Sequence, residues 1–399
     1  PIRGNGLSGL MIHQPQAYVK NDQTGAVSFS SQNYRFNSFY IDGVLQNDLF
    51  GLSPTGTIMG ETGILVAAPE SFEQMQLLVS PYDASLGSFT GAAINMITRS
   101  GKNKPMQEIY TTNRSNAHQY WHSGVNISGP IAPNKSFYFI NLDQVNETIT
   151  RPFNTNEYVG ETNRIEKLKR FRQSMQDLHG YDIGSFDQTE KNSSQKMAVR
   201  IDVLVNKKNQ LTINAKWANG FRSNNPLSSA TILQFSNNGK IQMHQYYSAS
   251  VEWKKSINAF TQNKLLFSLN HHQSNTQPRL QAFPSIRILD GEGMLMLGAG
   301  EETFQNQLTQ FNLNVSNRWS RLRGKNWIEW GVDVDYSVLN NHFIPNGHGQ
   351  FFYYSISNFL QNRNAVDFSI NQVSNTKSKI ESLAQLKVIK AALFFNYHN

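Results

Sequence analysis

The 399-residue sequence contains no cysteine, and only 16% of its residues are charged. Disulfides, thiolate zinc sites and cysteine nucleophiles are therefore excluded, while the redox compartment is left undecided. No apolar run approaches the roughly 18 residues that a membrane-spanning helix needs. This excludes an α-helical membrane protein but not a protein that crosses the membrane with alternating strands. The 39% apolar residues and 27 glycines indicate a folded chain.

The positive charge of the chain is diffuse. The formal net charge is +8, and its 36 lysines and arginines form no dominant block. Such a chain suits an acidic surface such as lipopolysaccharide, whereas the absence of a basic block argues against a nucleic-acid partner. The sequence begins at Pro1 and reaches Asn399 within a strand-like segment, so we expect a fragment of a longer protein. The absence of a signal peptide therefore carries no information.

Two regions with different patterns divide the sequence. Residues 1–104 are rich in glycine and poor in long strands, whereas residues 105–399 consist largely of alternating segments. One clear segment has apolar residues at every second position, namely Met197, Val199, Ile201, Val203 and Val205. Alternation of this kind is typical of a strand with one apolar and one polar face. We expect two domains with a boundary within 100–105.

Ten strands are expected in the second region. They lie at 107–115, 119–128, 135–146, 195–206, 210–221, 241–254, 262–273, 304–319, 326–341 and 384–398. After the first pair, short turns alternate with long loops at 147–194, 222–240, 274–303 and 342–383. Long strands with this alternation, and Trp253, Trp319 and Trp327 near strand ends, are typical of an antiparallel transmembrane β-barrel with periplasmic turns and extracellular loops. A large soluble β-sandwich is the alternative.

The number of strands adds a constraint. Ten strands in an open sheet would leave two unpaired edges in lipid, where backbone groups have no other partner. A closed ten-stranded barrel would be too narrow to hold a domain of the size of residues 1–104, whereas a barrel of about 22 strands has a lumen wide enough. We therefore expect further strands beyond Asn399.

The first region carries a family resemblance. Residues 33–43 read NYRFNSFYIDG, residues 69–83 read PESFEQMQLLVSPYD, and residues 87–101 read GSFTGAAINMITRSG. These segments resemble the plug domain of TonB-dependent outer-membrane receptors, most closely the Oar-like branch. Residues 128–139 and 391–395 of the second region are also similar to that family. The resemblance implies a mixed α/β plug inside the barrel and a receptor that imports a substrate across the outer membrane.

The plug motif predicts a set of structural residues. They are Ile41, Asp42, Gly43, Gly87, Gly91, Asn95, Arg99 and Gly101. Asp42 and Gly43 form a turn signal, and Gly87 and Gly91 permit turns or close backbone approach. The resemblance implies that Arg99 pairs with a carboxylate of the inner barrel wall, with Asp202, Asp333 and Asp335 as candidates. A solvated linker role for Arg99 is the alternative.

The resemblance also implies where substrate and partners would bind. Substrate would lie between the extracellular loops and a plug apex built from two turns. The first turn supplies Gln46, Asn47 and Asp48, and the second, around Gly87, supplies Leu86, Ser88 and Phe89. TonB would grip a segment that precedes Pro1, and its pull on the plug would open a path.

One helix is expected, at residues 163–180. Asn163 and Glu166 form a capping box, and Gly180 ends the helix. Its apolar stripe comprises Ile165, Leu168, Phe171, Met175 and Leu178. Its basic residues are Lys167, Lys169, Arg170 and Arg172, which suggest a lid over the lumen or a contact with lipopolysaccharide phosphates. A packed loop helix with a solvated basic face is the alternative.

Other chemical signals are weak. The G-x-G-x-x-G pattern at residues 4–9 follows no strand, so nucleotide binding is not expected. Four histidines lie in loops or at strand ends, namely His271, His272, His342 and His348. Their spacing is not that of metal ligands. No Ser/His/Asp or paired-carboxylate arrangement stands out. We therefore expect neither an enzyme nor a resident metal or cofactor.

Several functional alternatives remain open from the sequence. Within the receptor class, the chain could belong to a SusC-like glycan importer that works with a surface lipoprotein. From other classes, a non-transporting outer-membrane adhesin or structural barrel, or a soluble carbohydrate-binding β-protein, would share the strand pattern. Peptide, glycan and metal-chelate substrates are all compatible with the sequence.

Overall fold

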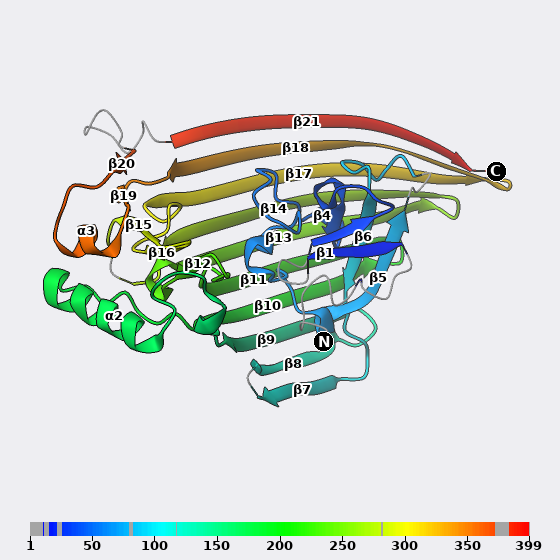
Figure 1. The fold of residues 1–399 in the computed structure, drawn as a ribbon. Helices are drawn as coiled ribbons and strands as arrows, with labels where there is room; N and C mark the ends of the chain where they lie inside the picture. Colours follow the sequence, from blue (N-terminus) through cyan, green and yellow to red (C-terminus); the bar gives the residue numbers. More distant parts are fainter. Residues whose placement is uncertain are drawn as a thin grey trace.

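The computed structural model describes residues 11, 16–21, 26–79, 83–116, 118–280, 282–371 and 383–398. Figure 1 shows three parts: a large curved sheet, here called the wall, a smaller unit against one of its faces, and a compact assembly at one end of its strands. The G-x-G-x-x-G pattern at residues 4–9 and residues 80–82 of the plug resemblance lie outside the described ranges.

The wall is an antiparallel sheet of ten strands. In spatial order they are β21 (Leu383–His398), β18 (Asn326–Ile344), β17 (Gln305–Arg323), β14 (Thr261–Pro278), β13 (Lys240–Asn258), β11 (Asn209–Asn224), β10 (Gln188–Asn206), β9 (Ser136–Arg151), β8 (His118–Ala132) and β7 (Met106–Ser115). All ten predicted strands are confirmed. The observed strands are mostly longer than predicted because pairing continues where the apolar alternation has ended, as in β9, which pairs with β10 as far as Arg151.

The two faces of the wall differ in polarity. The face toward the smaller unit buries polar side chains, including Lys196, Asp202, Lys216, Asn270, His272 and Gln310. The opposite face exposes apolar side chains, including Met197, Ile213, Val251, Trp253, Phe267 and Val332. Soluble sheets bury their apolar face, so this reversal indicates a wall whose outer surroundings are apolar.

Residues 26–98 form most of the smaller unit, the plug. Its four-stranded sheet has the order β4 (Val44–Leu45), β3 (Ser38–Ile41), β6 (Ala92–Thr98) and β5 (Phe72–Val79). A separate hairpin joins β1 (Ala17–Asn21) and β2 (Ala26–Phe29). Three short 3-10 helices complete it, η1 (Tyr34–Phe36), η2 (Gly60–Thr62) and η3 (Pro69–Ser71). The plug core includes Phe39, Ile94 and Met96, and extends onto the wall through Ala218 and Tyr246.

The third part is built from the four long connections between wall strands and is here called the loop module. Its mixed sheet has the order β12 (Ile232–Gln234), β16 (Gly293–Leu297), β15 (Ser285–Asp290), β19 (Gln350–Tyr353) and β20 (Asp367–Ser369). The helices are α2 (Ile165–His179) and α3 (Ile356–Leu360), with short 3-10 turns η4 (Thr155–Glu157) and η5 (Ser236–Asn238). Figure 1 places it at the end of the wall opposite the short turns. The sequence predicted only α2 within these connections, so the module's sheet is a correction.

Helix α2 confirms one part of its prediction and corrects two. Gly180 ends the helix in the left-handed region with φ +63°, where glycine is favoured. The N-cap is Arg164, without a side-chain cap bond, so the predicted capping box from Asn163 is wrong. Ile165 and Leu178 are exposed because only Leu168, Phe171 and Met175 face the core of the loop module. No helix in the described ranges is long and apolar enough to cross a membrane.

Candidate functional site

A tight turn in the plug directs a carboxylate at the wall. The turn between β3 and β4 places Asp42 at φ +53° and Gly43 at φ +81°. Asp42 tolerates this left-handed conformation because its carboxylate accepts hydrogen bonds from the Thr98 backbone N–H (2.8 Å) and hydroxyl (2.6 Å). The predicted Asp42–Gly43 turn is therefore present, and it fixes the carboxylate rather than leaving it solvated.

Asp42 forms a buried ion pair with the wall. Lys216 Nζ on β11 lies 2.6 Å from Asp42 Oδ2, and both side chains are almost fully buried. Burial alone raises the pKa of the Asp42 carboxyl, but the Lys216 ammonium and the Thr98 hydrogen bonds outweigh it and hold the pKa below its usual value. The pair is one of the charged contacts between plug and wall, and separating the two surfaces would leave each charge without its partner.

A second network holds the exit of the plug. Arg200 on β10 donates from Nη1 to the Thr98 carbonyl at 2.6 Å and from Nε to Asp202 Oδ2 at 2.8 Å. Ser100 donates its hydroxyl hydrogen to the same Asp202 oxygen at 2.6 Å. At the exit of the plug, the Thr98 carbonyl and the Ser100 side chain are therefore both hydrogen-bonded to β10.

Arg99 takes a different partner from the three predicted. Its Nη1 lies 2.6 Å from Glu108 Oε2 on β7, and the pair is partly exposed. Asp202 is bonded to Arg200 and Ser100, whereas Asp333 and Asp335 accept from Asn314. The prediction of an Arg99 pair with one of these three carboxylates is corrected, because Arg99 sits beside the first wall strand.

The two turns predicted to form the apex lie at different heights of the wall. Asn47 O accepts from Gln310, near the long-loop end of β17, whereas Ser85 O accepts from Arg318, near its short-turn end. Ser88 nevertheless lies beside the same plug segment as Asn47, because Ser88 O accepts from Ser38 Oγ and the Asn47 side chain bonds Asn37 and Phe39. One apex built from both turns, with Leu86 and Phe89, stays a prediction.

The upper turn is also engaged within the protein. Gln46 is buried and accepts a hydrogen bond from Tyr246 of β13 at 2.6 Å. The Asn47 side chain accepts from the Phe39 N–H and donates to the Asn37 carbonyl. Asp48 accepts from the backbone N–H groups of residues 50 and 53. These hydrogen bonds hold the plug loop in place.

Other plug glycines and polar residues have structural roles. A Cβ at Gly91 would lie 2.4 Å from Asn37 Oδ1, and one at Gly101 would lie 2.3 Å from the Tyr138 carbonyl. Both positions therefore exclude a side chain. No atom lies within 4 Å of the same point at Gly87, so close approach does not explain that glycine. Ile41 and Asn95 lie on β3 and β6, with Ile41 in the plug core.

Comparison with solved structures identifies this arrangement. The outer-membrane transporter YddB of Escherichia coli superposes with a TM-score of 0.67 at 11% identity, over 100% of this chain and 52% of YddB. The ferric enterobactin receptor PfeA of Pseudomonas aeruginosa gives 0.56 at 11% identity, over 87% and 48%. The siderophore receptor PirA of Acinetobacter baumannii gives 0.55 at 12% identity, over 85% and 46%. The chain has the TonB-dependent receptor fold. It spans about half the length of these three proteins.

Among these comparisons, only those with solved structures give a match. No protein-family model and no curated protein matches the sequence. None of the three receptors is described as Oar-like, so membership of that branch stays a prediction. In this fold the described plug and ten wall strands correspond to the plug and part of the barrel.

Two cavities separate the plug from one side of the wall. The larger, of about 550 Å³, lies between plug residues that include Tyr40 and Leu86 and the wall strands from β10 to β21. A smaller cavity of about 200 Å³ lies toward Asn47 and Leu339. Both are lined by Leu45, Asn314, Asp335 and Lys390. Lys390 Nζ bonds Asp335 (2.9 Å) and Ser88 Oγ (2.8 Å), so one ion pair lies where the cavities meet.

The basic residues of α2 have mixed environments. Arg172 makes a two-pronged pair with Asp182, with both distances 2.9 Å, and Lys167 donates to the Glu161 carbonyl at 2.6 Å. Lys169 and Arg170 are exposed. The helix rests with its apolar side on the loop module, so its basic side chains lie on the outer side of the module.

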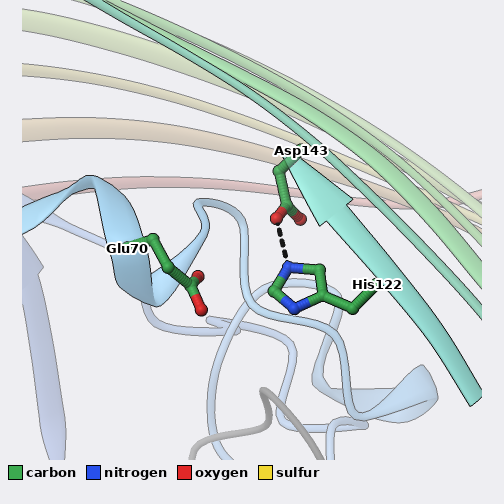
Figure 2. Close-up of side chains that lie close together, drawn as sticks. All are labelled: Glu70, His122 and Asp143. Carbon is green, nitrogen blue, oxygen red and sulfur yellow. Dashed lines mark hydrogen bonds and ion pairs between the residues drawn. The ribbon is translucent and has the colours of Figure 1, made fainter. Parts of the chain in front are cut away.

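A cluster that the sequence did not reveal lies between the plug and the first wall strands. Figure 2 shows Glu70 from η3 beside His122 of β8 and Asp143 of β9. Their potential ligand atoms lie within 4.8 Å of one another, the only such group in the described part of the chain. His122 Nε2 lies 2.6 Å from Asp143 Oδ2, and Lys196 Nζ lies 3.2 Å from Asp143 Oδ1.

The surroundings of Asp143 fit a charged network within the wall better than a metal centre. Tyr110 also donates to Asp143, at 2.9 Å. With Lys196 beside it, the carboxylate already has a buried cation, which a metal ion would have to displace. Of the four histidines singled out in the sequence, His272 contacts His244 and His348 packs edge-on against Phe304. None belongs to a metal-type cluster among the described residues.

Proposed function

We propose that this chain is the plug and part of the barrel of an outer-membrane receptor that imports a substrate by energy-dependent movement of the plug. The observation that carries the proposal is the buried Asp42–Lys216 pair, which joins a folded plug to the polar face of a wall whose other face is apolar. A polar, plugged interior and an apolar exterior suit a barrel in the outer membrane. The TonB-dependent receptor fold supports the same location.

The energy would come from TonB, acting on a segment N-terminal to Pro1. The plug is joined to the wall by charged contacts at Asp42–Lys216 and around Arg200 and by an apolar core that includes Tyr246. Breaking a buried ion pair costs about 3–5 kcal/mol when one partner is left uncompensated. Thermal fluctuation would seldom open this set of contacts, which is why an external force is part of the proposal.

The two cavities offer a route for the substrate. They lie on the side of β14 to β21 and meet at the Lys390–Asp335 pair. The larger cavity combines charged and amide side chains with apolar ones, whereas Leu49, Leu339 and Val388 make the smaller one mainly apolar. The larger cavity suits a substrate with polar groups. Ferric siderophores are the first class to test, because PfeA and PirA are described as receptors for such compounds.

Location and energised uptake test the proposal together. Native membranes would be fractionated and the protein detected by peptide mass mapping. Uptake of radiolabelled ferric siderophores, an oligosaccharide mixture and a peptide mixture would then be compared with and without a protonophore. We expect outer-membrane location, and uptake of one class that a protonophore abolishes. In-frame deletion of residues 1–104 should abolish this energy-dependent uptake.

Other outcomes would redirect the assignment. Uptake of oligosaccharides together with co-purification of a surface lipoprotein would favour the glycan importer. Outer-membrane location without any energised uptake would favour an adhesin or structural barrel. Recovery of the protein in a soluble fraction would overturn the proposal.

A further inference from the structure

Two carboxylates of the plug face the wall in opposite electrostatic settings. Asp42 has its own cation, because Lys216 Nζ lies 2.6 Å away and makes no other ion pair within the described residues. Glu61, on η2, lies higher in the plug and also faces the wall with a mostly buried side chain. The difference between them is which positive charges stand nearby.

The chain packs η2 closely against the wall. Within the plug, residue 60 must be glycine, since a Cβ there would lie 1.7 Å from Thr55 Oγ1. On the wall, Gly220 of β11 makes room for Met59, whose Cε would lie 2.7 Å from a Cβ at that position. This close fit brings Glu61 Oε2 to 3.2 Å from Gln242 Nε2 and 3.9 Å from His244 Nε2 on β13.

The cations near Glu61 are already paired with other acids. Arg222 bonds Glu190 at 2.6 Å and gives Glu61 only a backbone contact, from Nη1 to the carbonyl oxygen at 3.2 Å. Lys240 bonds Glu302 at 2.5 Å. Within the described ranges, no lysine or arginine forms an ion pair with the Glu61 carboxylate. An ionised Glu61 is therefore a mostly buried charge with one amide donor.

The two histidines beside Glu61 are buried next to each other, so a positive charge on either ring would be costly. His244 is fully buried, and its Nδ1 shares a hydrogen with His272 Nε2 at 3.0 Å. The remaining nitrogen, Nε2, has no hydrogen-bond partner among the described atoms and points toward Glu61. A neutral His244 can present either a lone pair or an N–H there, depending on the tautomer. The contact with Glu61 therefore depends on which group carries the proton.

We propose that the Glu61–His244 contact is a proton-sensitive latch that holds the upper plug against the wall while Glu61 is protonated and loosens when Glu61 ionises. A neutral Glu61 can donate to the lone pair of His244 Nε2 after a small side-chain shift. An ionised Glu61 loses hydration on burial and is repelled by the Asp48 and Glu302 carboxylates, and the attraction of the Lys240 ammonium offsets this only in part.

The sign of the pH dependence follows from the surroundings. Burial, together with the nearby Asp48 charge, raises the pKa of Glu61 to about 7, against an ordinary value of 4.5. The docked plug therefore keeps a proton that the undocked plug has already released, and docking weakens as the pH rises from about 4.5 to about 7. Between about pH 6 and about pH 8 the docking equilibrium should fall about tenfold.

A cysteine-free chain allows a direct test. Ala218→Cys places one thiol on the wall inside the plug core, where Ala218 is fully buried, so a maleimide reacts with it only when the plug lifts. Asn258→Cys, at the exposed end of β13, corrects for the effect of pH on thiol reactivity. The normalised labelling rate of the whole protein in outer-membrane vesicles should rise about tenfold from about pH 6 to about pH 8.

Substitutions separate the latch from general loosening. Glu61→Gln should give slow, pH-independent labelling, and Asp48→Asn should move the midpoint to lower pH. Glu70→Gln, which neutralises a plug carboxylate that lies beside His122 and not beside His244, should leave the tenfold response intact. A flat profile in the unmodified background, or an unchanged response in Glu61→Gln, would overturn the proposal. The labelling reports plug docking alone, so its result does not depend on whether the protein transports a substrate.

Discussion

The plug and the loop module each have a buried core, but the chain builds them in different ways. The plug core comes mostly from one continuous stretch and adds Ala218 and Tyr246 from the wall. The loop-module core combines residues from four separate connections, for example Phe171, Leu233, Ile288 and Phe359. The plug therefore depends on the wall for part of its interior, whereas the loop module depends on loops meeting one another. Changes in one should leave the other intact.

The largest expected effect is on the attachment of the plug. Lys216→Met removes the cation of a buried pair and leaves Asp42 uncompensated, which should weaken plug docking by about 4 kcal/mol. Maleimide labelling of Ala218→Cys would measure it. The double variant Asp42→Asn with Lys216→Met should recover most of the loss. If single and double variants label equally fast, the charge pair does not hold the plug.

A cavity in the core of the loop module should destabilise the loop module and leave the plug unaffected. Leu168→Ala leaves a cavity beneath α2, because Leu168 is fully buried in the loop module, and should cost about 3 kcal/mol. Hydrogen exchange should quicken in β15 and β16 and stay unchanged in β3 and β6. Faster exchange in the plug strands would show that the two cores are coupled.

Through Asp42, acid should weaken the docking of the plug, whereas protonation of Glu61 should strengthen it. The pKa of Asp42 is lowered in the folded protein, so its contribution is present above its ordinary pKa and is lost as the pH falls through the lowered value. We expect pepsin to cleave the plug faster as the pH falls below about 4. The double variant at residues 42 and 216 should lack this added sensitivity. An identical acid profile in both proteins would contradict the assignment.

The smallest effect is expected on the surface of the loop module. Arg172 and Asp182 form a well-aligned but exposed pair. Arg172→Ala should therefore change the stability of the module by about 0.5 kcal/mol, and less in high salt. Urea unfolding followed by hydrogen exchange in α2 would measure it. A loss comparable to that of Leu168→Ala would mean that the pair holds the helix in place.

The wall strands could be predicted because their pattern depends on residues that are neighbours in the sequence. Alternation along each strand predicted all ten wall strands, since one face must be apolar and the other polar. The strand ends were missed where pairing runs on through polar residues, as at Thr148–Arg151 of β9. The Asp42–Gly43 turn was also readable, because few residues adopt positive φ in succession.

The rest depends on contacts between distant segments. Strands β12 and β20 have three residues each, too few to show alternation, and β12–β16 and β15–β19 are parallel pairs between separate loops. The partner of Arg99 was missed because sequence cannot rank Glu108 against Asp202 without the path of the exit segment. Lys216 could have been singled out from the sequence, because it lies in the middle of a predicted strand on the polar face. A lysine buried there needs an acidic partner.

The parallel pairing of β3 with β6 sets how the plug would respond to mechanical load. Tension applied from the N-terminal side pulls β3 by its start, while β6 is anchored at its end through residues 99–105. In a parallel pair these forces act in shear and load every hydrogen bond of the ladder at once. The β1–β2 hairpin is antiparallel, so the same tension peels it open one bond at a time. We expect single-molecule extension to release the hairpin at low force, after which the central sheet transmits the remaining load to the wall contacts.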